Sequence, residues 1–343
     1  AQVSVQKLPV GNHTTNTASM MSYGFNPYLS SWSPYHGAAY AVVDAVAKAV
    51  AAGAEYDKMR FSYQEYFEKM SSRKAWGKPL SALLGALRMQ VELNLPSIGG
   101  KDSMSGTFGD MSVPPTLIAF GVTTIDARKA LSPEFKGAGH PVYLVRHTPK
   151  ADGMPDTEQL ARIWDAVGSE VERGSLLAGW AVTFGGVAEG LAKMTFGNRV
   201  GFAFANDVPM NEIFGYNYGA FILELEGDAS VGTLIGKTTE KAAITYKDDV
   251  LCLADLLKIY EDKLEPVFTC NNVDNGKADI PDLTKPAYEK RVSTVKSASP
   301  RVLIPVFPGT NCEYDSAKAM RDAGAEPKII VINNLSADGI SRS

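Results

Sequence analysis

The chain has 343 residues, of which 45% are hydrophobic and 21% are charged. This apolar content, with 14 Phe and 14 Tyr, excludes a disordered protein, because the chain can bury enough apolar surface to fold. The formal net charge of -4 gives no basic footprint for nucleic acid, and no apolar run reaches the roughly 18 residues of a membrane span. We therefore expect neither a nucleic-acid partner nor a membrane partner.

The three cysteines, Cys252, Cys270 and Cys312, are odd in number and far apart in the sequence. This pattern excludes a disulfide scaffold and a CxxC zinc site, and it is typical of a reducing compartment. The amino terminus has no basic stretch followed by an apolar core, so no secretory signal is visible. We expect a cytoplasmic protein, and the missing initiator Met leads us to expect a piece of a longer one.

The chain length predicts about two domains with a fragment of a third. The first predicted domain spans residues 1–134. In chain order we expect a polar, turn-rich opening up to residue 27, a helix over 37–52, a strand over 59–63, a helix that begins at Pro79 and ends near Leu93, a strand end and turn over 97–103, and a strand buried on both faces over 116–124.

The second predicted domain spans residues 135–270 and has an α+β pattern. We expect strands over 141–146, 178–183, 200–204, 220–225 and 242–246, and helices over 156–172, 187–194 and 253–264, the first of them capped by Asp156 or Thr157. Residues 271–300 are polar and predict an extended linker.

The tail, residues 301–343, predicts a buried strand over 301–307, a tight turn over 309–313, a helix over 315–323 and a second strand over 328–332. This order is typical of the start of a doubly wound parallel domain. Two strands cannot bury both faces of a parallel sheet, so we expect a domain that is truncated.

Two glycine-containing segments are candidates for phosphate binding. The first is Gly99, Gly100, Lys101, Asp102 and Ser103, where glycines permit close backbone approach and Lys101 supplies a cation; a simple turn is an equal alternative. The second is Gly185 and Gly186 at a predicted helix start, where close helix–strand packing explains the glycines at least as well.

The remaining polar candidates carry little chemistry by themselves. Asp44 and Lys48 have helical i,i+4 spacing and predict a solvated ion pair. The four histidines, His13, His36, His140 and His147, have no metal-ligand spacing. Cys312 falls at a helix start, but the tail contains no histidine to act as its base, which favours an inert thiol.

Two segments together resemble a known family. Residues 98–107, IGGKDSMSGT, with VPPT at 113–116, resemble the second synthetase-type domain of the large phosphoribosylformylglycinamidine synthase. Residues 301–313, RVLIPVFPGTNCE, resemble the first strand and turn of the glutaminase domain fused to that enzyme. The resemblance covers nearly the whole chain. It implies an α/β and α+β fold: a half like aminoimidazole-ribonucleotide synthetase, with a barrel-forming domain and a flanking domain, followed by a truncated class I glutaminase start.

The resemblance implies a ligase of purine biosynthesis. With ATP and Mg²⁺, such an enzyme converts formylglycinamide ribonucleotide and glutamine to the amidine; ATP activates the amide oxygen and ammonia displaces the phosphate. The family's glutaminase nucleophile lies in a later Gly-x-Cys-x-Gly motif that this sequence lacks. We therefore expect the piece alone to be inactive and to form a homodimer through its barrel strands.

The resemblance also assigns residues. It implies that Lys101 binds phosphate, that Asp102 orients Lys101 or a metal, and that residues Gly309, Thr310, Asn311 and Cys312 help to shape the glutamine pocket, with Cys312 not the nucleophile.

The chain departs from the family pattern at an auxiliary magnesium–nucleotide site. Asp44 matches a metal-binding Glu, but Lys48 stands where the family has Asn, and Ala181 stands where a further acid is expected. Phe184 replaces the Asp of a Ser-Asp-Gly-Gly turn. We predict that this site is degenerate and that the chain itself binds no cofactor there.

Two alternatives stay open. One is a non-catalytic structural or binding half of a synthetase-superfamily protein. The other is a selenophosphate synthetase or thiamine-phosphate kinase, against which the tail from Arg301 argues, because those enzymes have no fused glutaminase.

Overall fold

The computed structural model describes residues 1–11, 13–205, 208–227, 231–269 and 296–342. The chain divides into two compact units, Ala1–Asn271 and Asn272–Ser343. Most of the predicted linker and Cys270 lie outside the described residues. Among the residues that are described, none of the helices combines the length and the apolar character that a membrane crossing requires.

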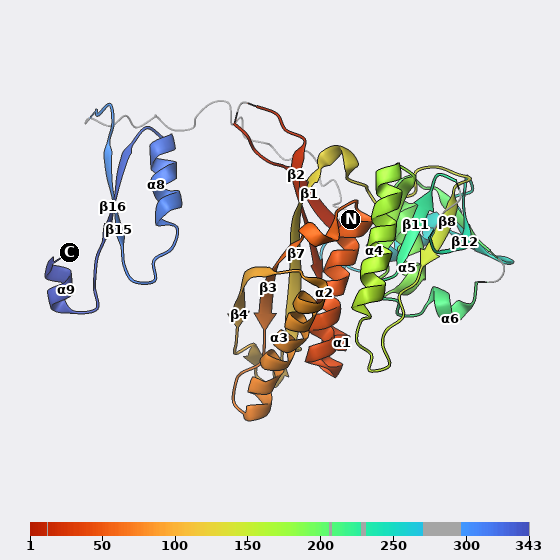
Figure 1. Cartoon of the computed structure of the whole chain (residues 1–343), viewed down its shortest axis with the longest axis horizontal. Coiled ribbons are helices and arrows are strands. Elements are labelled where there is room, and N and C mark those ends of the chain that lie inside the picture. The colour runs from red at the N-terminus through yellow and green to blue at the C-terminus, as the bar shows by residue number, and fades with distance from the viewer. Residues whose placement is uncertain (12, 206–207, 228–230, 270–295, 343) are drawn as a thin grey trace. The chain divides into compact units, whose positions relative to one another are not determined.

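The first unit begins with a five-stranded sheet in the order β1-β2-β7-β3-β4 (Figure 1). Its strands are β1 (Val3–Lys7), β2 (Thr17–Gly24), β7 (Thr116–Asp126), β3 (Arg60–Tyr66) and β4 (Ser97–Ser103). All neighbours are antiparallel except β3 and β4. The hairpin of β1 and β2 replaces the predicted turn-rich opening, because Ala18, Met20 and Ser22 alternate as buried residues along β2.

The helix α2 (Pro34–Ala51) confirms the predicted alanine-rich helix, and Ser33 caps it by accepting from the His36 amide. Every residue from position 37 to position 51 is buried. The helix contacts β2 and β7 of the first sheet and also β9 of the second sheet, so it lies between them (Figure 1). Small side chains permit this: a Cβ at Gly24 would lie 1.9 Å from the Ala41 carbonyl oxygen.

The helix α3 (Arg73–Leu93) begins six residues before the predicted start at Pro79. The prediction was wrong because Ser72 is the cap: its hydroxyl accepts from the Ala75 amide at 3.1 Å. Pro79 therefore lies inside the helix, where it has no N–H to donate.

Two further expectations for this sheet were wrong. Residues 97–103 form the edge strand β4 and not a turn, because they pair with β3 along their whole length. The strand β7 is buried on one face only: Leu117 and Ala119 are buried under the helices, whereas Ile118, Phe120 and Val122 are half-buried.

A seven-stranded sheet follows in the order β14-β13-β10-β12-β8-β11-β9. Its strands are β14 (Asp249–Cys252), β13 (Ala243–Tyr246), β10 (Gly201–Phe204), β12 (Thr233–Thr239), β8 (Pro141–Val145), β11 (Phe221–Leu225) and β9 (Leu176–Ala181). The sequence prediction missed β12, whose seven residues are mainly polar, and β14, whose four residues are all exposed.

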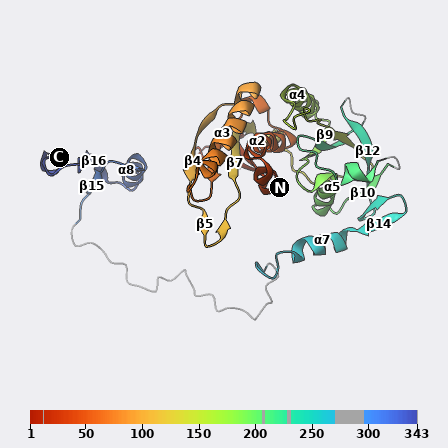
Figure 2. The same ribbon diagram turned by 90° about the horizontal axis from the view of Figure 1, so that it is seen from below.

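Three helices pack around this sheet: α4 (Thr157–Arg173), α5 (Gly186–Phe196) and α7 (Leu253–Asp262). Asp156 caps α4 by accepting from the Gln159 amide, as expected. Figure 2 shows α7 running from β14 beside α5, both of which it contacts. The first unit also contains α1 (Pro27–Trp32), η1 (Tyr56–Lys58), β5 (Thr107–Phe108), β6 (Met111–Ser112), η2 (Ala127–Lys129) and α6 (Met210–Ile213).

The second unit contains β15 (Arg301–Val306), α8 (Glu313–Asp322), β16 (Glu326–Val331) and α9 (Ala337–Arg342). The strands β15 and β16 are parallel and pair from Arg301 with Glu326 to Val306 with Val331. The predicted burial of the first strand was wrong: its side chains alternate between exposed and half-buried, and Leu303 is 61% exposed. Among the described residues this sheet has two strands, so it leaves apolar surface uncovered.

Candidate functional site

The predicted phosphate segment lies on the exposed edge strand β4. Gly100 pairs with Tyr63 of β3 so closely that an added Cβ would lie 2.3 Å from the Tyr63 carbonyl oxygen. Gly99 has φ +154° and open space around it. Close strand packing therefore explains Gly100 without a ligand, whereas phosphate binding by Gly99, Lys101, Asp102 and Ser103 stays a prediction.

Lys101 is the exposed cation of this segment. Its backbone carbonyl accepts from Gln64 Nε2 at 2.9 Å, which fixes the strand at this position. Its ammonium group makes no ion pair within the described residues. It is therefore available to an anionic ligand at the edge of the sheet.

Glu65 is a buried carboxylate that sequence reasoning missed. It is 1% exposed and pairs in register with Asp102 of β4. Burial raises the pKa of Glu65 to about 8, and the neighbouring Asp102 carboxylate contributes. The alternation along β3 is the signal that could have found it, because it places Glu65 on the same face as the buried Phe61 and Tyr63.

The amides at the start of α5 are already hydrogen-bonded within the chain. The Gly185 N–H donates to Glu189 Oε2 at 2.8 Å, and the Gly186 N–H donates to the Thr183 carbonyl at 3.0 Å. Thr183 Oγ1 also donates to Glu189 Oε2, at 2.9 Å. A phosphate at Gly185 and Gly186, which stays a prediction, would have to displace this internal carboxylate.

The electrostatics of Glu189 support this arrangement. Burial alone would raise its pKa, but the hydrogen bond and charge of Lys193, with the bonds from Thr183 and Gly185, outweigh burial and lower it. The Lys193 ammonium donates to Glu189 Oε1 at 2.5 Å. The helix start therefore holds a fixed internal ion pair.

Asp44 and Lys48 form a buried ion pair on α2. Lys48 Nζ lies 2.8 Å from Asp44 Oδ2, and the two side chains are 11% and 5% exposed, so the predicted solvated pair was wrong. The pair is buried because α2 lies between the two sheets. Lys48 also donates to the Tyr23 carbonyl at 2.8 Å, and its ammonium lies 4.6 Å from the Tyr23 ring centre. Burial raises the pKa of Asp44 to about 6, although Lys48 counteracts this.

These residues do not fit a magnesium ion. The carboxylate of Asp44 already binds an ammonium group, and a divalent cation beside Lys48 would be repelled. Within the described ranges no group of three or more His, Cys, Asp and Glu side chains is placed to hold a metal ion. Mg²⁺ in nucleotide sites is usually held by one or two carboxylates together with phosphates and waters, and here the Asp44 carboxylate is already paired with Lys48.

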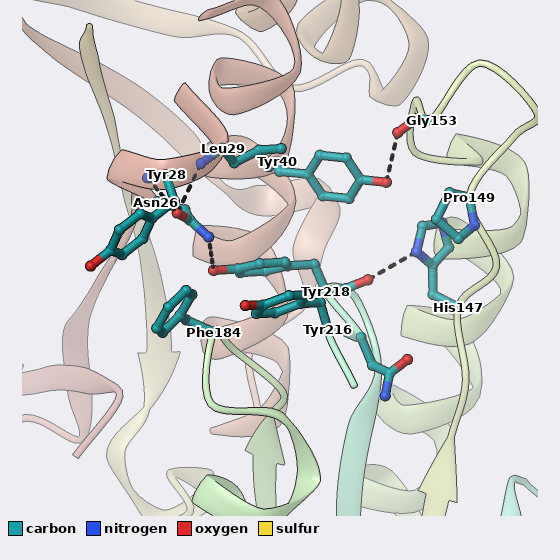
Figure 3. Close-up of a pocket in the computed structure, with 11 residues that line it drawn as sticks. Asn26, Tyr28, Leu29, Tyr40, His147, Pro149, Gly153, Phe184, Tyr216 and Tyr218 are labelled. Carbon is teal, nitrogen blue, oxygen red and sulfur yellow. Dashed lines mark hydrogen bonds between the residues drawn. The ribbon is translucent and has the colours of Figure 1, made fainter. Parts of the chain in front are cut away.

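An aromatic cavity of about 490 Å³ opens beside α2 (Figure 3). Its walls come from α1, α2, the loop before α5, the loop before β11 and the loop after β8. Its lining residues are Asn26, Tyr28, Leu29, Tyr40, His147, Pro149, Gly153, Phe184, Tyr216, Asn217 and Tyr218. Of these, sequence reasoning singled out Phe184, for its departure from a motif, and His147, which it set aside.

Hydrogen bonds hold the polar groups of the cavity in place (Figure 3). Asn26 Nδ2 donates to the Tyr218 phenol oxygen at 2.9 Å, and the Tyr40 phenol donates to the Gly153 carbonyl at 3.0 Å. His147 Nε2 accepts from the Asp156 amide, so Nδ1 carries the hydrogen that is donated to the Tyr218 carbonyl at 2.9 Å. Burial lowers the pKa of His147, which keeps the ring neutral.

In the second unit, the predicted glutamine-pocket turn is tight and exposed. The Thr310 N–H donates to the Phe307 carbonyl at 2.9 Å, and the Phe307 N–H donates to Thr310 Oγ1 at 3.0 Å. Gly309 and Cys312 have left-handed backbone angles, φ +87° and +66°, and Cys312 is the N-cap of α8. A role for Gly309, Thr310, Asn311 and Cys312 in binding glutamine stays a prediction.

The sequence matches two kinds of known protein. Residues 299–342 match a CobB/CobQ-like glutamine amidotransferase domain. The chain is 24% identical over 204 residues to the phosphoribosylformylglycinamidine synthase subunit PurL of Thermoplasma acidophilum, covering 53% of this chain and 26% of the relative. It is also 24% identical over 232 residues to the same subunit of Picrophilus torridus, with 61% and 30% covered. The chain thus spans about a quarter to a third of these relatives.

Solved structures share the fold. Thermotoga maritima PurL complexed with FGAR aligns with 71% of this chain and 46% of its own, with a TM-score of 0.57 and 13% identity. The thiamine monophosphate kinase of Aquifex aeolicus aligns with 69% of this chain and 91% of its own, with a TM-score of 0.50 and 13% identity. The predicted fold class and the predicted resemblance to phosphoribosylformylglycinamidine synthase are therefore confirmed.

Proposed function

We propose that this chain supplies a synthetase-like half and the opening of the amidotransferase domain of a phosphoribosylformylglycinamidine synthase. The order of the two matches supports this: PurL-like sequence precedes a glutamine amidotransferase segment in one chain. Thiamine monophosphate kinase shares the fold of the first unit. The amidotransferase segment favours an ammonia-dependent ligation over that enzyme's phosphorylation.

The reaction activates the amide oxygen of formylglycinamide ribonucleotide with ATP, and ammonia from glutamine then displaces the phosphate. Negative charge develops on the transferred phosphoryl oxygens, so a mobile ammonium group at the site lowers the barrier. We assign this role to Lys101, because its ammonium has no ion-pair partner in the described part of the chain. Asp102, next to it on β4, would orient Lys101 or a metal.

The 343 residues lack the Gly-x-Cys-x-Gly segment in which the family's glutaminase nucleophile lies. The chain alone is therefore expected to be inactive with glutamine. Complementation tests the function: a complete gene whose product contains these 343 residues should restore growth without purines to a bacterial strain that lacks phosphoribosylformylglycinamidine synthase. Failure to grow, with the protein present in soluble form, would reject the proposal.

The auxiliary magnesium–nucleotide site is proposed to be degenerate. The Lys48 ammonium forms an ion pair with the Asp44 carboxylate, and the aromatic side chain of Phe184 stands where the family has a carboxylate. The double variant Lys48→Asn with Phe184→Asp should bind MgADP measurably in calorimetry, whereas the parent chain should not. An ordered Mg²⁺ beside Asp44 in crystals of the parent chain soaked with MgADP would contradict the proposal.

The chain is also proposed to self-associate through its five-stranded sheet. Met21 and Tyr23 on the open face are 48% and 55% exposed, and the Tyr23 ring lies 6.4 Å from the half-buried Phe120 ring. Such an apolar sheet face is usually covered. Sedimentation should show a dimer that Tyr23→Lys dissociates, and a monomer at micromolar concentration would contradict this interface.

A further inference from the structure

A second cavity, of about 360 Å³, shares no lining residue with the aromatic cavity beside α2. Its walls come from the helices α5, α6 and α7 and from the strands β10, β13 and β14 of the seven-stranded sheet (Figure 2). None of the residues predicted to bind phosphate, metal or glutamine lines it. It is therefore separate from the candidate sites described above.

Apolar side chains form most of this cavity. Leu191 and Ile213 in its lining are 0% and 3% exposed, which places them at its floor. Phe214, Leu251 and Met210 in the same lining are 67%, 53% and 48% exposed, which places them at its rim. A concave site that leaves large apolar side chains in water favours an apolar ligand, because the ligand removes that surface from water.

The polar side chains of the lining provide an acceptor and no free donor. The lining contains two of them, Tyr246 and Asp249. The Tyr246 phenol donates its hydrogen to the Val208 carbonyl at 2.7 Å. The exposed Asp249 carboxylate has neither an ion pair nor a side-chain hydrogen bond within the described ranges. A ligand must therefore bring the donor, and a cationic donor gains most from a carboxylate.

One side chain of the protein itself shows that this rim attracts positive charge. Lys247 Nζ lies 5.2 Å from the centre of the Tyr246 ring, although Lys247 is not part of the lining. The face of an aromatic ring and a carboxylate both attract a cation. A carboxylic acid with an apolar body would instead meet the Asp249 carboxylate as a like charge, so the rim disfavours it.

We propose that this cavity binds a small amine with an apolar, aromatic body, which places its ammonium group at Asp249 and its ring beside Phe204 and Phe214. The volume equals that of roughly a dozen water molecules, which corresponds to a ligand of about ten non-hydrogen atoms. Rings in the wall offer edge and face contacts to a ring in the ligand. The inference does not rest on the proposed ligase activity, so either can fail without the other.

Isothermal calorimetry on the 343-residue chain compares 3-phenylpropylamine with 3-phenylpropanol and 3-phenylpropanoate, which share its body, and with propylamine, which lacks the ring. The amine should bind saturably, the alcohol about 3-fold and the carboxylate at least about 10-fold more weakly, since an exposed charge pair contributes modestly. Propylamine should bind at least about 30-fold more weakly, because the ring supplies the buried apolar area. Absence of saturable binding by 3-phenylpropylamine would overturn the proposal, as would equal or tighter binding of the carboxylate.

Variants locate the ligand. Asp249→Asn should abolish the preference for the amine over the alcohol and leave the affinity for the alcohol unchanged. Asp248→Asn removes the neighbouring exposed carboxylate outside the lining and should change neither affinity. Leu251→Ser should weaken the amine and the alcohol about 5-fold each, whereas Leu84→Ser, at a 49% exposed leucine of α3, is its matched control and should weaken neither. Thermal melting shows that each variant is folded. If either folded variant, Asp249→Asn or Leu251→Ser, binds the amine as the parent does, the proposal fails.

Discussion

The Lys48 ammonium lies 2.8 Å from the Asp44 carboxylate, one helical turn away, in a pair that is almost wholly buried between two sheets. Sequence spacing alone describes a common surface pair, worth little to stability. Burial makes this pair matter for stability, because each buried charge has lost its hydration and only the opposite charge compensates for that loss. The same contact removes the carboxylate from metal binding.

Removing the Lys48 ammonium should therefore lower the free energy of unfolding. Lys48→Met leaves Asp44 buried without its counter-charge, and we expect a loss of about 3–5 kcal/mol in the free energy of unfolding. Urea denaturation measures this at neutral pH. Lys58→Met, which breaks the exposed pair with Glu55, is the control and should leave the urea midpoint unchanged. Equal midpoints for Lys48→Met and the parent would show that the pair is not buried as described.

Glu65 should make stability depend on pH. Its pKa is about 8 in the folded chain, above the ordinary 4.5, so the folded state holds its proton where the unfolded state has lost it. Its contribution is present below about pH 4.5 and is lost as the pH rises through 8. The free energy of unfolding of Glu65→Gln relative to the parent should therefore increase between pH 6 and pH 8, by an amount on the order of 3 kcal/mol.

The difference between the parent and Glu65→Gln isolates Glu65, because Asp44, with a pKa of about 6, titrates in both proteins and its effect cancels. Asp102→Asn removes the neighbouring carboxylate and should shift the transition to lower pH without abolishing it. A difference between parent and Glu65→Gln that stays constant from pH 6 to pH 8 would rule out a raised pKa.

Gly100 should be required for strand packing. A methyl group there would lie 2.3 Å from the Tyr63 carbonyl, so Gly100→Ala must push β4 from β3, at a cost of about 1–3 kcal/mol. Gly77→Ala is the control: its added methyl meets no atom within 4 Å inside α3, and the variant should be stabilised by about 1 kcal/mol. Thermal denaturation distinguishes the two, and a Gly100→Ala protein as stable as the parent would leave only a ligand-based reason for this glycine.

Cys312 should react as an ordinary exposed thiol and not as a glutaminase nucleophile. It lies exposed at the start of α8, and the sequence has no histidine after position 147 to serve as its base. A glutamine-directed chloroketone should leave it unmodified, while a general thiol reagent labels both Cys312 and the exposed Cys252. Peptide mass spectrometry assigns the sites. Stoichiometric chloroketone labelling at Cys312 would refute this assignment.

Local sequence signals predicted the helices that are stabilised by residues close together in the sequence. The alanine-rich α2 and the amphipathic α4 with its Asp156 cap lie close to the expected positions. The hairpin of β1 and β2 was missed because polar residues alternate with its apolar ones and because it is stabilised by non-local contacts with β7 and α2. Pro79 misplaced the start of α3, because the cap at Ser72 outweighs the preference of proline for the first turn.

The candidate site was less predictable for a physical reason. The cavity gathers rings from segments that are far apart in the sequence, such as Tyr28, Phe184 and Tyr216, so no spacing rule connects them. Glu65 and Asp102 meet through strand pairing across 37 positions, which periodicity cannot reveal. The Asp44–Lys48 spacing was visible, but its burial depends on the second sheet.

The most direct test of the proposed activity is an assay of the purified complete protein that contains these 343 residues, with formylglycinamide ribonucleotide, glutamine and ATP. We predict that the amidine ribonucleotide forms together with equal amounts of ADP and phosphate, and that Lys101→Ala raises the KM for ATP or for the ribonucleotide. A folded product that makes no amidine, even when ammonia replaces glutamine, would contradict the account.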